Sequence, residues 1–171
     1  LHNARQNGSK ITSFCNVIGS TMSRLAENGA YLHAGPEFSV ASTKAVTNMI
    51  ALFGLLATSI SPQGEETSSF ISEMRKIPSR ISKQLLGDDG SINAAVSIIS
   101  DANSAIFIGR GISSFLAQEG ALKMMEVAYL PCIAYPGGEL KHGPIALIEE
   151  GTPVIAIAPS DKTLGLMESS I

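Results

Sequence analysis

The chain lacks any concentration of positive charge, which argues against a nucleic-acid partner. Its 171 residues hold 12 Lys and Arg against 15 Asp and Glu, so the formal net charge is −3. The densest basic group lies within residues 75–83 and is spread along one expected helix. Proteins that bind nucleic acids usually present a basic patch or stripe. We therefore expect no nucleic-acid partner.

Long hydrophobic runs are also missing. The longest, at residues 49–57, is well short of the roughly 20 residues that a membrane helix needs. Residues 1–5 do not begin the apolar segment of a signal peptide. We therefore expect no membrane segment. The mean hydropathy is nevertheless +0.22, which favours buried parallel strands together with a subunit or domain interface.

Cysteine and histidine are too few and too scattered for a disulfide framework or a metal site. The two cysteines, Cys15 and Cys132, each lie in a strand-like run, and His2, His33 and His142 stand apart from one another. Cysteines used in this way are typical of a reducing compartment. We expect free thiols, a cytoplasmic location, and neither a metal nor another cofactor.

What the sequence does contain is an alternation of strand and helix patterns. Runs rich in apolar and β-branched residues predict strands at 10–17, 30–33, 105–109, 132–135 and 153–158. Helical spacing predicts helices opening at 39–44 and stopping near 61–62, then at 68–86 with a break or second start at Pro78, at 91–100, at 115–129 and beginning within 161–171. A turn is expected at 87–90.

This alternation predicts an α/β fold with parallel sheets wrapped by helices. Residues 1–60 and 101–171 each read as part of an α/β domain, and 61–100 reads as a helical bridge between them. Each part has few strands for a finished doubly wound domain. We therefore expect the chain to begin and end inside domains.

The most informative stretch is 138–144, with the sequence GELKHGP. It places a carboxylate, an ammonium and an imidazole within four consecutive residues, Glu139 to His142, with Lys141 between them. Glycines and a proline flank them, as where a backbone approaches another group closely. Loops at strand ends are where α/β proteins place chemistry, and histidine is a common acid or base there. A polar loop with an exposed histidine is the alternative interpretation.

A second group of charges follows helical spacing. Glu119, Lys123 and Glu126 are separated by four and three residues, so they share one face of the predicted helix. A solvated helix face is the ordinary interpretation. The neighbouring residues are largely apolar, however, and charges on such a helix are expected to line a cavity or interface. A carboxylate held beside a lysine could move a proton next to a carbonyl.

Two further segments have weaker signals. Residues 40–44 (VASTK) open a predicted helix, and their hydroxyls and amides could bind an anion or sugar hydroxyls, or could simply cap the helix. Residues 109–114 place a Gly-x-Gly after a strand. That turn could cradle a phosphate or could be a plain connection between strand and helix.

Taken in order, these segments resemble the isomerase half of the glutamine–fructose-6-phosphate aminotransferase family. The resemblance is carried by residues 15–20 (CNVIGS), 33–37 (HAGPE), 40–45 (VASTKA), 109–111 (GRG), 119–126 (EGALKMME) and 138–144. It implies two sugar-isomerase (SIS) domains of flavodoxin-like type, with 1–60 ending the first, 61–100 as the bridge and 101–171 beginning the second.

The resemblance also implies a reaction in which ammonia from glutamine combines with fructose 6-phosphate to give glucosamine 6-phosphate, a precursor of other amino sugars and of cell walls. Glu126 would then move the proton between C1 and C2, with Lys123 beside it. His142 would open the sugar ring, reaching the site from a neighbouring subunit of a homodimer. Val40 and Ser42 would contact the sugar, and Glu119 and Lys141 would have supporting roles.

The resemblance places several functional parts outside the sequence. A phosphate-binding loop is expected before Leu1, and a Schiff-base lysine beyond Ile171. A glutaminase domain is expected elsewhere in the same polypeptide, so the chain alone should be inactive. Two alternatives remain open: a SIS-domain deaminase or isomerase of glucosamine 6-phosphate without a glutaminase, and a non-catalytic SIS module that senses a phosphosugar.

Overall fold

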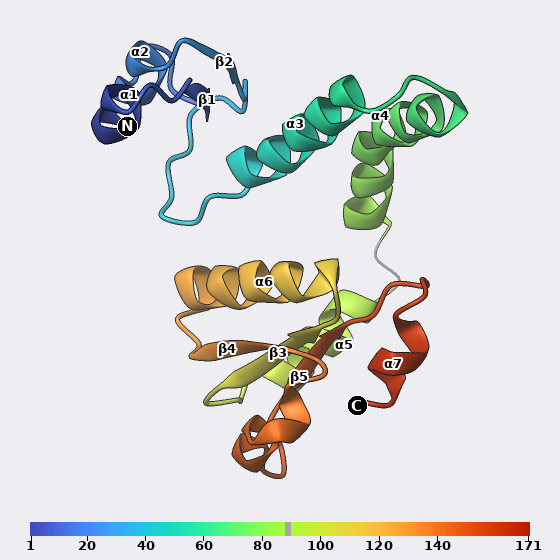
Figure 1. Ribbon diagram of the computed structural model, residues 1–171. Coiled ribbons are helices and arrows are strands. Elements are labelled where there is room, and N and C mark those ends of the chain that lie inside the picture. The colour runs from blue at the N-terminus through green and yellow to red at the C-terminus, as the bar shows by residue number, and fades with distance from the viewer. Residues whose placement is uncertain (88–89) are drawn as a thin grey trace. The chain divides into compact units, whose positions relative to one another are not determined.

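The computed structural model describes residues 1–87 and 90–171, which form two compact units, Leu1–Leu86 and Gly87–Ile171 (Figure 1). The predicted turn at 87–90 includes residues 88 and 89, which lie outside the described residues. The sequence-based division at residues 60 and 100 stays a prediction.

The first unit opens with a short parallel strand pair. The elements are α1 (His2–Gln6), β1 (Thr12–Cys15), α2 (Thr21–Leu25) and β2 (Asn28–Tyr31). Thr12 pairs with Asn28 and Cys15 with Tyr31, so the two strands run parallel.

The strand predicted at 30–33 lies two residues earlier in the structure, at Asn28–Tyr31. Asn28 and Gly29 gave no strand signal, yet the ladder requires glycine at this point. A Cβ on Gly29 would lie 2.2 Å from the backbone oxygen of Ser13. The close approach of the two backbones therefore explains both the glycine and the missed strand start.

Two long helices complete the first unit: α3 (Lys44–Ile60) and α4 (Glu65–Leu86). Gly54 lets them approach, because a Cβ there would lie 3.3 Å from Met74 Sδ and from the ring of Phe70. Phe14 of β1 meets Phe53 of α3 edge to face, with ring centroids 5.6 Å apart. These contacts anchor α3 to the strand pair and to α4.

The ends of the two helices differ partly from the predictions. The helix α3 stops at Ile60 as expected, but it begins only at Lys44, so residues 39–43 are loop. The predicted break at Pro78 is wrong, because α4 continues through it. Proline removes one backbone donor, and the turns on either side keep the helix continuous.

The second unit is a three-layer α/β arrangement. Its elements are α5 (Ser91–Ile99), β3 (Ala105–Gly109), α6 (Ile112–Ala128), β4 (Cys132–Pro136), the 3-10 helices η1 (Leu140–His142) and η2 (Pro144–Leu147), β5 (Val154–Ile157) and α7 (Leu164–Glu168). The strands are all parallel, in the order β4-β3-β5. The predicted fold class is confirmed, and α6 begins three residues before its predicted start.

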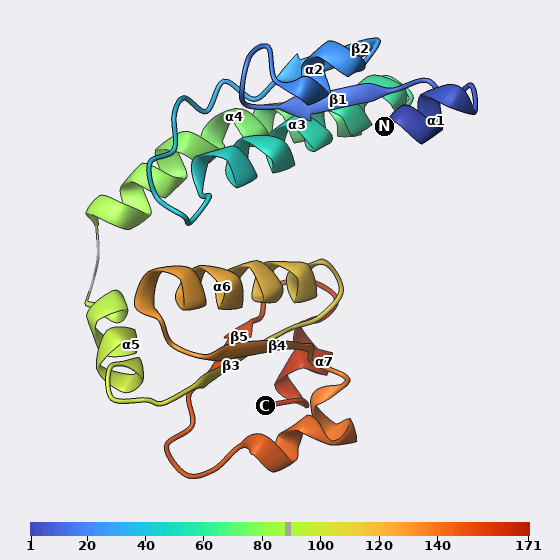
Figure 2. The same cartoon turned by 90° about the vertical axis from the view of Figure 1, so that its left-hand side faces the viewer.

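The central strand β3 is buried along its whole length and serves two hydrophobic cores. Phe107 packs with Ala117 and Ala121 of α6 on one face of the sheet. Ile108 packs with Leu140 of η1 and Met167 of α7 on the other. Alternation along a strand requires this division. Figure 2 shows α6 on one side of the sheet and the segment after β4 on the other.

Candidate active site

The three predicted charges of α6 form one cluster. Lys123 Nζ lies 2.5 Å from Glu126 Oε2 and 3.3 Å from Glu119 Oε1. Glu119 and Lys123, which were predicted to share one helix face, form an ion pair. The side chains of Glu126 and Lys123 are 21% and 23% exposed, and that of Glu119 is 35% exposed. The cluster is therefore partly shielded from solvent, unlike an ordinary solvated helix face.

The cluster lies on the side of α6 that points away from its own sheet. Ala117 and Ala121 pack against β3, and a period of about 3.6 residues puts the three charges on the opposite side of the helix. Two large apolar side chains share this outer side: Phe115 is 68% exposed and Leu122 is 41% exposed. A surface that combines exposed apolar groups with shielded charges is typical of a binding or interface region.

The ion pairs determine what Lys123 can do chemically. The hydrogen bond to Glu126, followed by the interactions with Glu119, raises the pKa of Lys123 above its ordinary value of 10.5, although desolvation acts in the opposite direction. Lys123 therefore stays an ammonium near neutral pH. It can hold a carboxylate or stabilise negative charge, and a carboxylate of the cluster is left to accept a proton.

The stretch 138–144 is folded more tightly than the loop expected from sequence. Leu140 is 3% exposed and anchors η1 against the sheet, while Lys141 and His142 are exposed. Lys141 Nζ donates a hydrogen bond to the backbone oxygen of Ser169. The 3-10 turns therefore fix the backbone while leaving the imidazole accessible.

The glycines before η1 do mark close approaches, but the partner is the chain itself. A Cβ on Gly137 would lie 2.8 Å from Met167 Sδ, and the Gly137 amide donates to the Gly109 oxygen at 2.8 Å. A Cβ on Gly138 would lie 3.5 Å from Arg110 Nη1. These contacts tie the carboxyl ends of β3 and β4 together.

Glu126 and His142 are not brought together within the second unit. Glu126 lies on α6, which covers one face of the sheet, and His142 lies in η1, whose Leu140 packs on the other face. Among the residues that the structure describes, no hydrogen bond or ion pair joins them. The sheet therefore separates the two predicted catalytic groups of one chain.

Val40 and Ser42 lie in the first unit, in the loop before α3. Val40 is 87% exposed, whereas the neighbouring Ala41 is 7% exposed and anchors the loop. Ser42 Oγ donates a 2.9 Å hydrogen bond to Glu37 Oε2. Ser42 is thus held by a residue that the sequence analysis did not single out.

Glu37 lies in the loop before α3, and its carboxylate reaches the amino-terminal end of that helix. Its Oε1 accepts the backbone amides of Thr43 at 2.9 Å, Lys44 at 3.0 Å and Ala45 at 3.3 Å. These bonds, the first from Thr43 and the next from Ser42, hold the pKa of Glu37 below its ordinary value of 4.5. The sequence left anion binding, sugar binding and ordinary capping open at this helix start, and the structure fills its amides with the chain's own carboxylate. The sequence signal that could have identified Glu37 is an acidic residue in the loop just before a predicted helix.

The Gly-x-Gly segment after β3 is a tight connection between strand and helix. A Cβ on Gly109 would lie 2.1 Å from the Ser113 oxygen, so only glycine fits. The amides of Ser113 and Ser114 donate to the oxygens of Arg110 and Gly111. Since these amides are already paired, the plain-turn interpretation fits better than a phosphate cradle.

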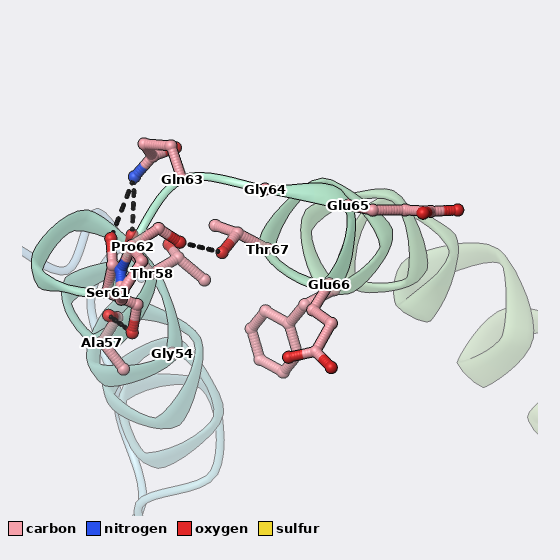
Figure 3. A pocket seen from close by; sticks show the side chains of 11 residues that line it. Gly54, Ala57, Thr58, Ser61, Pro62, Gln63, Gly64, Glu65, Glu66 and Thr67 are labelled. Atoms are coloured by element: carbon pink, nitrogen blue, oxygen red, sulfur yellow. Dashed lines mark hydrogen bonds between the residues drawn. The ribbon is translucent and has the colours of Figure 1, made fainter.

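A cavity of about 620 Å³ lies at the turn between α3 and α4 (Figure 3). Gln63 Nε2 donates there to the oxygen of Thr58, and Thr67 Oγ1 donates to the oxygen of Pro62. None of the predicted site residues lines this cavity. Within residues 1–87 and 90–171, no helix is long and apolar enough to cross a bilayer, and no three His, Cys, Asp or Glu gather as metal ligands.

Comparison with known proteins supplies the family. The SIS domain profile matches residues 1–59 and 98–170. Glutamine–fructose-6-phosphate aminotransferases (isomerizing) from Corynebacterium glutamicum and Chlorobaculum tepidum are 39% and 40% identical over the whole chain, which spans 28% of their length.

A solved structure agrees with the sequence relatives. The C-terminal domain of glucosamine-fructose-6-phosphate aminotransferase from Francisella tularensis has a TM-score of 0.92 and 32% identity, covering 99% of this chain and 49% of that one. The profile match covers well over half of the residues. The chain therefore belongs to the SIS domain family.

Proposed function

We propose that the chain is part of the ketose–aldose isomerase of an enzyme that makes glucosamine 6-phosphate from fructose 6-phosphate and glutamine. The observation that carries this proposal is the Lys123–Glu126 contact of 2.5 Å on the outer side of α6. It provides a shielded carboxylate beside a lysine that is an ammonium near neutral pH. Relatives that bear this activity in their names match the whole chain at 39–40% identity.

The chemistry needs one group that takes a proton from one carbon and returns it to the next. Ammonia condenses at C2 with loss of water to give an imine; Glu126 then removes a proton from C1 while the imine nitrogen takes up a proton, and an enolamine forms. Glu126 returns its proton to C2, the hydroxyl on C1 gives up its proton, and C1 becomes the aldehyde carbon of glucosamine 6-phosphate. Lys123, kept protonated by its carboxylate partners, orients Glu126 and stabilises negative charge that develops on the sugar oxygen.

His142 would open the sugar ring from a neighbouring subunit. The sheet lies between α6 and η1 in one chain, so a His142 that acts beside Glu126 has to come from a second copy. We therefore propose a homodimer with a composite site. Glu119 supports the site as the second partner of Lys123, and Lys141 supports it by bonding the Ser169 oxygen.

Val40 and Ser42 would contact the sugar from the first unit. Residues 1–60 and 101–171 would belong to two SIS domains joined by 61–100, in line with the profile match to 1–59 and 98–170. A glutaminase domain of the same polypeptide would supply ammonia. The free thiols Cys15 and Cys132 support a cytoplasmic location.

The test is to follow glucosamine 6-phosphate formation by the full-length protein that contains this chain. Fructose 6-phosphate is supplied with glutamine in one reaction and with ammonium in another. Product in both is expected. Product in the ammonium reaction but not in the glutamine reaction would contradict the proposed glutaminase domain. Ammonia release from glucosamine 6-phosphate without any synthesis would favour the deaminase, and binding without turnover would favour the sensing module.

A further inference from the structure

The carboxylate of Glu37 has all of its bonding directed to its own chain. Oε1 accepts three backbone amides at the start of α3, and Oε2 accepts the hydroxyl of Ser42 at 2.9 Å. A serine or threonine cap usually satisfies one such amide, from N2 or N3, so Glu37 does more than an ordinary cap. The 17-residue helix α3 is capped by a full negative charge where its dipole is positive.

The loop that presents Glu37 is fixed independently of it. Asn16 Nδ2 donates to the Gly35 oxygen at 2.6 Å, and Asn16 Oδ1 accepts the Ala34 amide at 2.9 Å. Lys44 Nζ donates to the Pro36 oxygen at 2.8 Å. The backbone just before Glu37 is therefore held at residues 34–36, and the carboxylate reaches Ser42 from a defined position.

The direction of the Glu37–Ser42 hydrogen bond has a chemical consequence. A carboxylate only accepts hydrogen bonds, so the hydroxyl proton of Ser42 is used by Glu37. Within residues 1–87 and 90–171 no group donates a hydrogen bond to Ser42 Oγ, so towards a ligand this oxygen can only accept. A free serine hydroxyl can rotate either to donate a hydrogen bond to a ligand or to accept one. The bond to Glu37 uses the donor and leaves only the acceptor function.

We propose that Glu37 is a positioning residue that makes Ser42 a hydrogen-bond acceptor for a sugar hydroxyl and keeps the substrate phosphate away from the start of α3. This inference rests on the proposed phosphosugar function. A phosphate placed at the helix start would meet the negative charge of Glu37 and would find the amides of residues 43–45 occupied. The loop at 40–42 thus selects the neutral, hydroxyl-bearing part of the sugar.

The variant Glu37→Gln tests this inference in the full-length protein. Its carbonyl oxygen can still accept the three helix amides, but its amide group would donate towards Ser42 and reverse that hydrogen bond. We expect the KM for fructose 6-phosphate to rise roughly tenfold, the size of one hydrogen bond to a ligand, while kcat stays within about twofold. Glu27→Gln, an exposed carboxylate of the same unit with no side-chain hydrogen bond among those described, is the matched control.

A double-mutant cycle separates positioning from a general structural effect. Ser42→Ala alone should raise KM by a similar factor, and adding Glu37→Gln to it should raise KM no further, because both changes remove one interaction. If Glu37→Gln does not fold, Glu37→Asp shortens the side chain and keeps the charge, and we expect the same rise in KM.

The outcomes are distinguishable. An unchanged KM in the Glu37 variant, or fully additive effects in the cycle, beside an active unmodified protein would overturn the inference alone. An unmodified protein that neither forms product nor binds glucosamine 6-phosphate in calorimetry would overturn the proposed function, and this inference with it.

Discussion

Glu37 of the first unit and Glu126 of the second have contrasting surroundings, and the contrast between them shows which can do chemistry. Glu37 in the first unit accepts four hydrogen bonds from its own chain. Glu126 in the second has one described partner, the ammonium of Lys123 at 2.5 Å. A carboxylate with few fixed donors keeps lone pairs for a substrate proton. Glu37 therefore organises the first unit, whereas Glu126 is suited to proton transfer.

The largest effect is expected when Glu126, the carboxylate suited to proton transfer, is replaced. Glu126→Gln preserves the shape of the side chain but removes its ability to accept a proton. We expect kcat to fall by roughly 10²- to 10⁴-fold with sugar binding retained, as for loss of a general base. Steady-state kinetics and calorimetry with glucosamine 6-phosphate measure the two effects. Glu168→Gln, on the exposed side of α7, should change neither; full turnover in Glu126→Gln would remove Glu126 from the mechanism.

The second largest effect is expected at Lys123, the cation that pairs with Glu126. Lys123→Met leaves Glu119 and Glu126 without their shared partner, so we expect kcat/KM to fall by roughly 10- to 100-fold, the range of a charge-assisted hydrogen bond. The raised pKa of Lys123 means that its stabilising contribution is complete below 10.5 and is lost as pH rises through the raised value.

A pH series of kcat/KM up to about pH 9 is therefore expected to show no decline caused by Lys123. Lys10→Met, an exposed lysine without described side-chain contacts, is the control. If both lysine variants behave alike, the ion cluster has no catalytic role.

The strand pair of the first unit offers a stability test that leaves the charges untouched. A Cβ on Gly29 would lie 2.2 Å from the Ser13 oxygen, whereas one on Gly64 would meet nothing within 4 Å. We expect Gly29→Ala to lower the free energy of unfolding by about 1–3 kcal/mol, as for overpacking. Gly64→Ala should change it by less than about 0.5 kcal/mol. Denaturant unfolding measures both, and equal values would contradict the close pairing of β1 with β2.

The smallest effect is expected on the free energy of unfolding at acid pH. Because the pKa of Glu37 is lowered, its contribution to stability is present above the ordinary value of 4.5 and is lost as pH falls below it through the lowered value. The difference in unfolding free energy between the unmodified protein and Glu37→Gln should therefore narrow as the pH falls below 4.5. Denaturant unfolding at several pH values measures it, and parallel pH curves would show that Glu37 does not titrate with folding.

Sequence patterns predicted most of the second unit because its strands are continuous apolar runs. Residues 105–109 read as a buried strand, and β3 has those bounds. The spacing of Glu119 and Lys123 also predicted that they share one helix face, where they form an ion pair, since neighbours on a helix face depend only on helical period.

Features that depend on distant backbone could not be read in this way. The start of β2 at Asn28 rests on the close approach of Ser13, and the start of α3 rests on a carboxylate seven residues before Lys44. The separation of Glu126 from His142 depends on which face of the sheet each segment covers. The amino-acid composition of a segment does not indicate which face of the sheet that segment will cover.

The most direct test of the account is subunit complementation between Glu126→Gln and His142→Ala in the full-length protein. Each variant alone should be nearly inactive. After subunit exchange, roughly a quarter of the unmodified activity should return, because half of the dimers are mixed and each of these has one intact site. Mixed dimers that form but show no activity would contradict a site built from Glu126 of one chain and His142 of another.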